Sequence, residues 1–457
     1  MYKRSYFIGI FAYILMLVLS LLFYKERTIF LDQAFNLFHI IKEGGFCIVH
    51  FRFGDAFFQV FPVIGVKLGV SLPVILASYS AGFVVYYFTA YLICGSVFKR
   101  YDFALVILLV NILFVSDTFY YIPSQAFEGM IALMIVFAAV AGKQFQTISF
   151  LEKCILLLVM IVIAFYHPLV VFGLLYSVVF FMLNKDTAVD KKVLYGIAIT
   201  YFAALAMKLI FFRTPYEGSA LGGLKNFVTQ FPDYITLFSN KRFLYNCLIK
   251  YYWMPIVFFS TAVYYIKTKD SRKFWFCSLY FFAYLALVNI SYPGRATPEY
   301  YMENLYLPIG LFLALPFIFD VLPVLEKKNI AHWAIILIIA SGCIRIYAAH
   351  SAYTARLNLE RAILDKYGSE KVVIKADKTD REVLQLLWGT PYEFLLLSES
   401  ERQKAASIII DEHPEKLEGL TSLKNGLRVN WETYLYADLP AKYFHFTDSA
   451  TAYKIDR

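Results

Sequence analysis

FLDQAFNLFHIIKEGG, residues 30–45, follows the first long apolar run of the chain and indicates how the rest is organised. One set of apolar side chains in it recurs at the i, i+3, i+4 and i+7 spacing of a helix face: Ala34, Leu37, Phe38 and Ile41. Residues 33–43 are therefore predicted to form an amphipathic helix, and beside a membrane span such a helix lies on the bilayer surface. Asp32 comes just before this helix, which places its carboxylate at the level of the lipid headgroups.

The composition is that of a membrane protein. Of the 457 residues, 60% are hydrophobic and 17% are charged, whereas soluble domains carry about 25% charged residues. We therefore predict an α-helical polytopic membrane protein whose partner is the lipid bilayer. The net charge of +9 does not indicate a nucleic-acid partner, because the basic residues lie in short clusters between apolar runs, where they orient a chain in the bilayer.

Eleven apolar runs are predicted as transmembrane helices. They are residues 6–24, 73–93, 103–119, 127–141, 155–165, 169–183, 193–212, 253–266, 275–290, 305–319 and 330–348. With eleven crossings, the basic clusters at 99–100 and 267–273 fall on the side of Lys3 and Arg4, which the positive-inside rule assigns to the cytoplasm. Treating 155–183 as one kinked helix would move the later basic clusters outside, so two spans are preferred.

This topology separates two domains. Residues 1–349 are predicted to form the transmembrane domain, with interfacial helices in the outer loops 25–72 and 213–252. From residue 350 onward, charged helical stretches alternate with short strand-like runs, and about a hundred residues suffice for a small domain. We therefore expect residues 350–457 to form an α+β extracytoplasmic domain. The N-terminus would be cytoplasmic and this domain periplasmic, as in a protein of the bacterial inner membrane.

The order of these elements resembles a known superfamily. One span is followed by an outer Asp32 and an interfacial helix, then by a second apolar outer segment with Pro62 and Gly69, paired spans and an outer domain. This layout is similar to the GT-C superfamily of polyprenyl-phosphate-sugar glycosyltransferases, which carry a catalytic aspartate in the first outer loop. The first outer loop lacks the adjacent Asp-Glu pair of the protein mannosyltransferase branch, and the chain has no DxD motif, so the branch is left open.

Asp32 is the candidate catalytic base, because transfer of a sugar to a hydroxyl requires a group that accepts the hydroxyl proton. An N-cap of the following helix is its alternative role, and the two roles are compatible. The segment 292–308 supplies candidate substrate-binding residues, with Arg295 for the donor phosphate and Tyr300, Tyr301 and Glu303 for isoprenoid or sugar, although an interfacial anchor would look alike. Arg52 and Asp55 are further candidates or a surface ion pair.

Three polar residues at outer turns are candidates for a second carboxylate or a ligand: Asp117, Glu128 and His167. Their spacing matches no metal motif, so structural roles are the alternative and no cofactor is predicted, with a divalent metal left open.

The predicted function is that of a membrane glycosyltransferase that moves a sugar from a polyprenyl-phosphate donor to a glycan, lipid or protein acceptor outside the membrane. A polysaccharide polymerase or ligase is the alternative among enzymes, and it would depend on Arg242 or Arg295 instead of Asp32. A lipid or solute transporter and a catalytically silent GT-C-like scaffold are alternatives of another class. Transport is disfavoured because the acids lie at the outer ends of the spans and not near the midplane.

Overall fold

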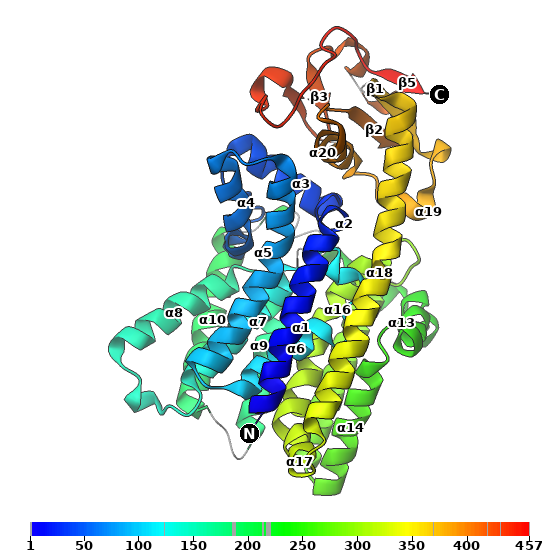
Figure 1. The fold of residues 1–457 in the computed structure, drawn as a ribbon. Helices are drawn as coiled ribbons and strands as arrows, with labels where there is room; N and C mark the ends of the chain where they lie inside the picture. The colour runs from blue at the N-terminus through cyan, green and yellow to red at the C-terminus, as the bar shows by residue number, and fades with distance from the viewer. Residues whose placement is uncertain are drawn as a thin grey trace.

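The computed structural model describes residues 2–122, 124–184, 189–212, 214–215, 221–368, 370–417, 419–429 and 431–456. Figure 1 shows a bundle of long helices with a smaller domain at one end, formed by the C-terminal part of the chain. We call this end of the bundle the domain end. The N-terminus lies at the opposite end.

Each of the eleven predicted runs contains a helix, and in the run predicted at 103–119 the helix ends at Ile112. The bundle consists of α1 (Lys3–Leu22), α5 (Leu72–Leu92), α6 (Tyr101–Ile112), α7 (Gln125–Val140), α8 (Phe150–Ala164), α9 (Val170–Leu183), α10 (Lys191–Phe211), α14 (Trp253–Thr268), α15 (Ser271–Ser291), α16 (Glu299–Pro316), α17 (Leu322–Lys327) and α18 (Ala331–Tyr367). Two π-helical turns, η2 (Ile93–Val97) and η7 (Phe317–Val321), extend α5 and join α16 to α17.

Six helical segments of the described chain are long and apolar enough to cross a membrane: Lys3–Leu22, Leu72–Val97, Lys191–Phe211, Ser271–Ser291, Glu299–Lys327 and Ala331–Tyr367. The other predicted runs form helices of 12 to 16 residues, namely α6, α7, α8, α9 and α14. At 1.5 Å per residue such helices fall short of the roughly 30 Å hydrocarbon core. The count of eleven crossings is therefore not confirmed.

The distribution of apolar side chains is that of an integral membrane protein. Inside the bundle, Phe103 to Ile112 of α6 are buried almost completely. Outer helices instead expose large apolar groups, such as Phe11 on α1 (72% exposed) and Ile199 on α10 (69%). Soluble monomers rarely expose large contiguous apolar surfaces, so the lipid bilayer is the environment that suits these helices.

Four short elements lie at the domain end between α1 and α5: α2 (Tyr24–Thr28), α3 (Leu31–Glu43), η1 (Phe53–Asp55) and α4 (Ala56–Leu68). The helix predicted at 33–43 is thus confirmed as α3. Its apolar face does not meet lipid, however. Leu37 and Phe38 are fully buried in a core shared with the C-terminal domain, where the ring of Phe38 lies 5.2 Å from that of Tyr392. The amphipathic pattern of α3 therefore reflects packing between protein layers.

The predicted interfacial segment 213–252 begins outside the described residues, at residue 213. Its described part forms short elements: η5 (Leu221–Lys225), α12 (Asn226–Thr229), η6 (Tyr234–Thr236) and α13 (Phe238–Ile249). Val228 and Leu248 are about four-fifths exposed on it, which suits contact with a bilayer surface.

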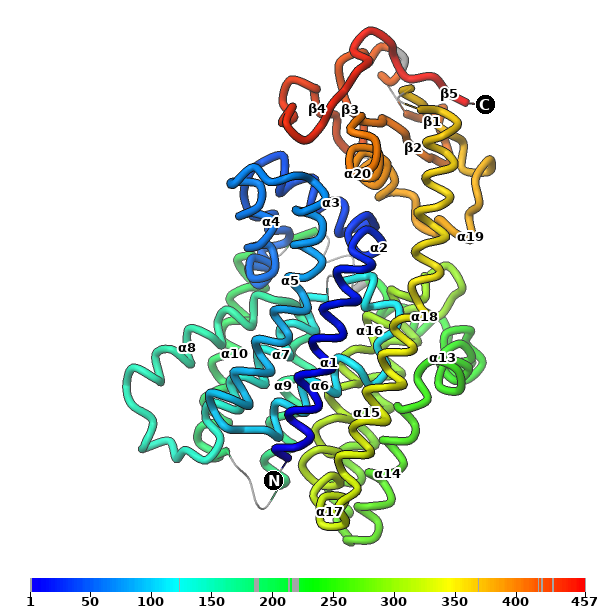
Figure 2. Tube along the Cα trace, in the orientation of Figure 1, coloured from blue at the N-terminus to red at the C-terminus, as the bar shows by residue number. Residues whose placement is uncertain are grey.

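The C-terminal domain begins without a linker. Helix α18 runs along α1 and continues into the domain, so it crosses the predicted boundary at residue 350 unbroken (Figure 2). The other elements are β1 (Lys371–Lys375), α19 (Arg381–Leu384), α20 (Thr390–Arg402), β2 (Ser407–Asp411), β3 (Gly426–Arg428), β4 (Thr433–Leu435) and β5 (Lys454–Asp456). Strands β2, β1 and β5 form a parallel sheet in that order, with Val373 opposite Ile409 and Ile455, and β3 pairs antiparallel with β4. A small sheet region near the C-terminus is confirmed.

Candidate functional site at the domain end

Asp32 lies in the first turn of α3, at the junction of the bundle and the C-terminal domain. One carboxylate oxygen, Oδ2, accepts a hydrogen bond of 2.5 Å from the hydroxyl of Tyr121. The other oxygen accepts no hydrogen bond from any residue that the structure describes, and the side chain is only half-buried. Tyr121 therefore holds one carboxylate oxygen of Asp32, and the other oxygen has no hydrogen bond from the described residues.

The C-terminal domain holds the backbone just before Asp32. Glu393, in the first turn of α20, accepts a hydrogen bond of 2.6 Å from the backbone N–H of Leu31 through one oxygen. Its other oxygen accepts two bonds from Arg356 on α18, at 3.0 and 2.6 Å. Leu31 has a φ of +40°, which is unfavourable for a residue with a side chain. Glu393 and Arg356 thus stabilise the turn that orients Asp32, and the candidate site depends on both domains.

The electrostatic surroundings of Asp32 act in opposite directions on its acidity. Burial raises the pKa of the carboxyl above its usual value, while the Tyr121 hydrogen bond and the positive charge of Arg52 lower it. The net direction is upward, because desolvation penalises the charged form more than these two groups favour it. A raised pKa suits a general base, which works best when its pKa lies near the operating pH.

A charged cluster lies next to Asp32. Arg52 donates a hydrogen bond of 2.9 Å to Gln125 on α7, and Gln125 donates one of 3.4 Å to Asp55. Burial raises the pKa of Asp55 to about 7, against the opposing effect of Arg52. Lys208 on α10 is also fully buried and interacts electrostatically with Asp55. The structure therefore brings the predicted residues Arg52 and Asp55 to Asp32, inside the protein and not as an ion pair on its surface.

Glu128 and His167 approach the same cluster from its inner side. Glu128 on α7 is completely buried and interacts with Asp55 and Arg52. Burial lowers the pKa of His167 well below its usual value, so its imidazole is neutral, and its Nδ1 accepts a bond of 3.1 Å from the N–H of Leu169. Among the described residues no group of three or more His, Cys, Asp and Glu side chains is placed to hold a metal ion.

Asp117 belongs to a different cluster. The ammonium of Lys250 pairs with Asp117 at 2.9 Å and with Glu299 at 3.1 Å. Glu303 is fully buried, and one of its oxygens accepts three hydrogen bonds from Ser116 and Thr118 at 2.7 to 2.9 Å. Glu303 therefore anchors the 116–118 turn of the chain, and its carboxylate is not presented to a substrate.

The tyrosines and arginine predicted in segment 292–308 divide between two places. Tyr300 packs against Phe30 and Tyr121, with ring centroids 5.1 and 4.9 Å apart, so it lies beside Asp32. Tyr301 packs at 5.7 Å on Tyr292. Arg295 is exposed and lies over the ring of Phe238 at 5.0 Å, away from these contacts. Tyr300 thus belongs to the Asp32 site, and Arg295 does not.

Sequence reasoning missed Tyr121, Glu393 and Arg356. Tyr121 lies 89 residues from Asp32, and Glu393 lies 362 residues from Leu31. The one local signal was the turn 116–128, whose polar residues flank Tyr121.

The fold and site together define an α-helical integral membrane protein with a half-buried carboxylate where its bundle meets a small C-terminal domain. No protein-family model, curated protein or solved structure matches the chain. Its chemistry is therefore inferred from the geometry of Asp32 and its neighbours.

Proposed function

We propose that the chain is a membrane glycosyltransferase of GT-C type, which moves a sugar from a polyprenyl-phosphate donor to a glycan, lipid or protein acceptor. The observation that carries this proposal is the carboxylate of Asp32. One of its oxygens is oriented by Tyr121, and the other is free to accept a proton.

The reaction needs few groups from the protein. The acceptor hydroxyl attacks the anomeric carbon of the sugar, and its proton passes to the free oxygen of Asp32. A new C–O bond forms as the bond between the anomeric carbon and the phosphate oxygen breaks, and polyprenyl phosphate leaves. A positioned base of this kind contributes about 10²–10⁴ in rate. Arg52 supplies a positive charge near the base.

The membrane arrangement is part of the proposal. Lys3 and Arg4 are in the first turn of α1, at the end of the bundle opposite the C-terminal domain. The positive-inside rule would place that end in the cytoplasm and the domain end outside. The shorter helices α6, α7, α8, α9 and α14 would then complete eleven crossings, and the C-terminal domain would be periplasmic in a bacterial inner membrane.

The test compares two carboxylates of the same helix. Purified protein is incubated with a panel of polyprenyl-phosphate sugars, and the release of free polyprenyl phosphate is measured. Asp32→Asn should reduce the rate by about 10²-fold or more. Glu43→Gln, at the exposed end of α3, should leave it unchanged. An Asp32→Asn protein that has the wild-type melting temperature and the wild-type rate would remove Asp32 from this role.

One observation favours a second candidate, a polysaccharide polymerase or ligase. Arg242 and Arg295 both lie over the ring of Phe238, at 4.8 and 5.0 Å from its centroid. Two guanidinium groups that share one aromatic ring offer N–H donors for a phosphate or diphosphate. In that case Arg242→Gln and Arg295→Gln would abolish joining of lipid-linked glycans, whereas Asp32→Asn would not.

A further inference from the structure

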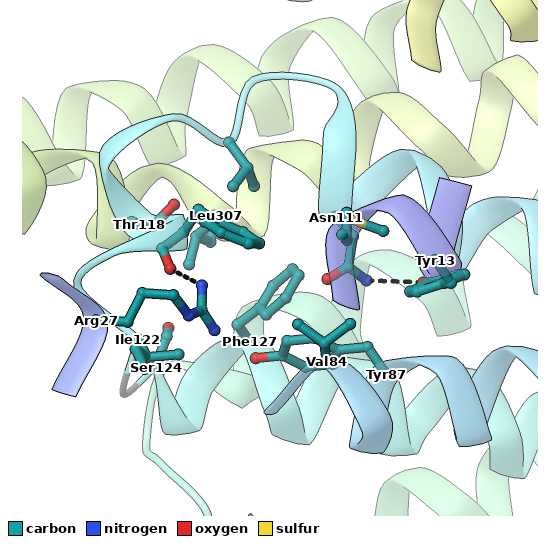
Figure 3. A pocket seen from close by; sticks show the side chains of 13 residues that line it. Tyr13, Arg27, Val84, Tyr87, Asn111, Thr118, Ile122, Ser124, Phe127 and Leu307 are labelled. Carbon is teal, nitrogen blue, oxygen red and sulfur yellow. Dashed lines mark hydrogen bonds between the residues drawn. The ribbon is translucent and has the colours of Figure 1, made fainter. Parts of the chain in front are cut away.

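A small cavity lies inside the domain end of the bundle, apart from Asp32 (Figure 3). It holds about 40 Å³ of space for solvent, and since one water needs about 10–15 Å³ by this measure, the cavity has room for about three. Most of its lining is apolar, including Val84, Phe127 and Leu307. Arg27 on α2, Tyr87 on α5 and Ser124 before α7 bring polar groups to it, and the other polar residues of the lining are Tyr13, Asn111 and Thr118.

Arg27 carries a buried charge without a counter-charge. Its side chain is 1% exposed and donates hydrogen bonds to the hydroxyl and carbonyl of Ser80, at 2.8 and 3.2 Å, and to the carbonyl of Phe119. No carboxylate pairs with it in the part of the chain that the structure describes, whereas the buried Arg356 pairs with Glu393. Burial lowers the pKa of Arg27 to about 9, so the group stays protonated at neutral pH. A buried cation of this kind is unfavourable unless an anion compensates it.

Two hydroxyl groups stand beside the guanidinium with their hydrogens unused. Ser124 is 5% exposed, and its Oγ has no hydrogen-bond partner among the described residues. The hydroxyl of Tyr87 likewise makes no hydrogen bond within the described chain, and it interacts electrostatically with Glu128 and, more weakly, with Arg27. Figure 3 shows the Tyr87 hydroxyl directed toward the guanidinium, with Ser124 next to it. A buried hydroxyl without a partner, such as that of Ser124, is rare in folded proteins.

We propose that this cavity binds a small monovalent anion of halide size, held by Arg27, Ser124 and Tyr87. The guanidinium of Arg27 brings a positive charge and N–H donors to this space, and the hydroxyls of Ser124 and Tyr87 can each donate a hydrogen bond to an ion held there. The positive charge suits an anion and not a cation. The apolar remainder of the lining and the room for a few waters favour a chloride-sized ion over a larger oxyanion. The bound ion joins α2, α5 and the start of α7, and it is independent of the proposed glycosyl transfer.

The first experiment locates the ion. Crystals of the full-length protein grown or soaked in sodium bromide are measured at the bromine absorption edge. We expect an anomalous peak within hydrogen-bond distance of Arg27, Ser124 and Tyr87. The bromide concentration is chosen from the melting-temperature experiment below, so that the stabilising effect is saturated. If the cavity then shows no anomalous peak, the assignment is wrong.

The second experiment measures binding in solution. The melting temperature of the full-length protein in detergent is followed while sodium chloride replaces sodium gluconate at constant ionic strength, and wild type should melt higher in chloride. Ser124→Ala and Tyr87→Phe should weaken the apparent chloride affinity by about tenfold, because each removes one hydrogen bond to a charged group. Arg27→Gln should abolish the chloride effect if it folds.

A matched control guards against general effects of losing a hydroxyl. Ser177 on α9 is fully buried, but its Oγ already donates to the carbonyl of Gly173 at 2.8 Å. Ser177→Ala should therefore keep the wild-type chloride affinity. Equal melting temperatures in chloride and gluconate would contradict the proposal. So would equal chloride affinities in wild type, Ser124→Ala, Tyr87→Phe and Ser177→Ala, or stabilisation by phosphate and not by halide.

Discussion

Replacing Tyr121 by phenylalanine tests whether Asp32 acts as a base and whether its geometry sets its acidity. The hydroxyl of Tyr121 donates the only hydrogen bond that Asp32 Oδ2 receives from the described residues, at 2.5 Å. This bond favours the carboxylate form and so lowers the pKa of Asp32. In Tyr121→Phe the ring remains and only the hydroxyl is lost, so the pKa of Asp32 rises further.

The size of the effect follows from the strength of one bond. A hydrogen bond to a charged group is worth about 1.5–3 kcal/mol, and about 1.4 kcal/mol corresponds to one pKa unit. The pKa of Asp32 is therefore expected to rise by about 1–2 units. Because Asp32 is half-buried, water replaces part of the lost hydrogen bond, so a rise near the lower end of this range is expected. A base must be deprotonated to act, so the acidic limb of kcat/KM moves to higher pH by the same amount.

The assay is the pH profile of polyprenyl-phosphate release by wild type and variant. Tyr120→Phe is the matched control, since its neighbouring hydroxyl donates to the carbonyl of Ile346 at 3.0 Å and not to Asp32. Its acidic limb should coincide with that of wild type. If the limb of an active Tyr121→Phe enzyme also coincided with wild type, Asp32 would not be the titrating base and the reasoning would fail.

Three further predictions concern stability, each measured by thermal or denaturant unfolding in detergent. Glu393→Gln should lower the stability by about 1.5–3 kcal/mol, because it removes the charge from the hydrogen bonds between Arg356 and Glu393 and leaves Glu360, at 3.3 Å, as the carboxylate that pairs with Arg356. Gly389→Ala should also destabilise, since a Cβ there would meet the backbone of Leu31 at 2.8 Å, while Gly196→Ala, with open space around it, should not. Asp55→Asn should stabilise the protein at pH 8 and flatten its pH dependence. The folded pKa of about 7 exceeds the unfolded value of about 3.9, so the folded state binds more protons between these values and wild type loses stability as pH rises through them. Equal slopes for wild type and Asp55→Asn would contradict this assignment.

The amino-acid sequence by itself determined the local elements of this protein. Each of the eleven apolar runs contains a helix, and the spacing of Ala34, Leu37, Phe38 and Ile41 predicted α3 to within two residues at its start. These features depend on neighbours three or four positions apart, which the linear sequence shows directly. The sequence also placed Asp32 at the start of α3.

Only the tertiary structure decided what α3 packs against and which charges meet. The apolar face predicted to contact lipid is covered by the C-terminal domain, because burial against protein and burial in lipid require the same pattern of side chains. Tyr121 reaches Asp32 across 89 residues, and Glu393 reaches the backbone of Leu31 across 362. Such contacts leave no periodic signal, since they arise from the packing of helices against one another and not from the chain around either residue.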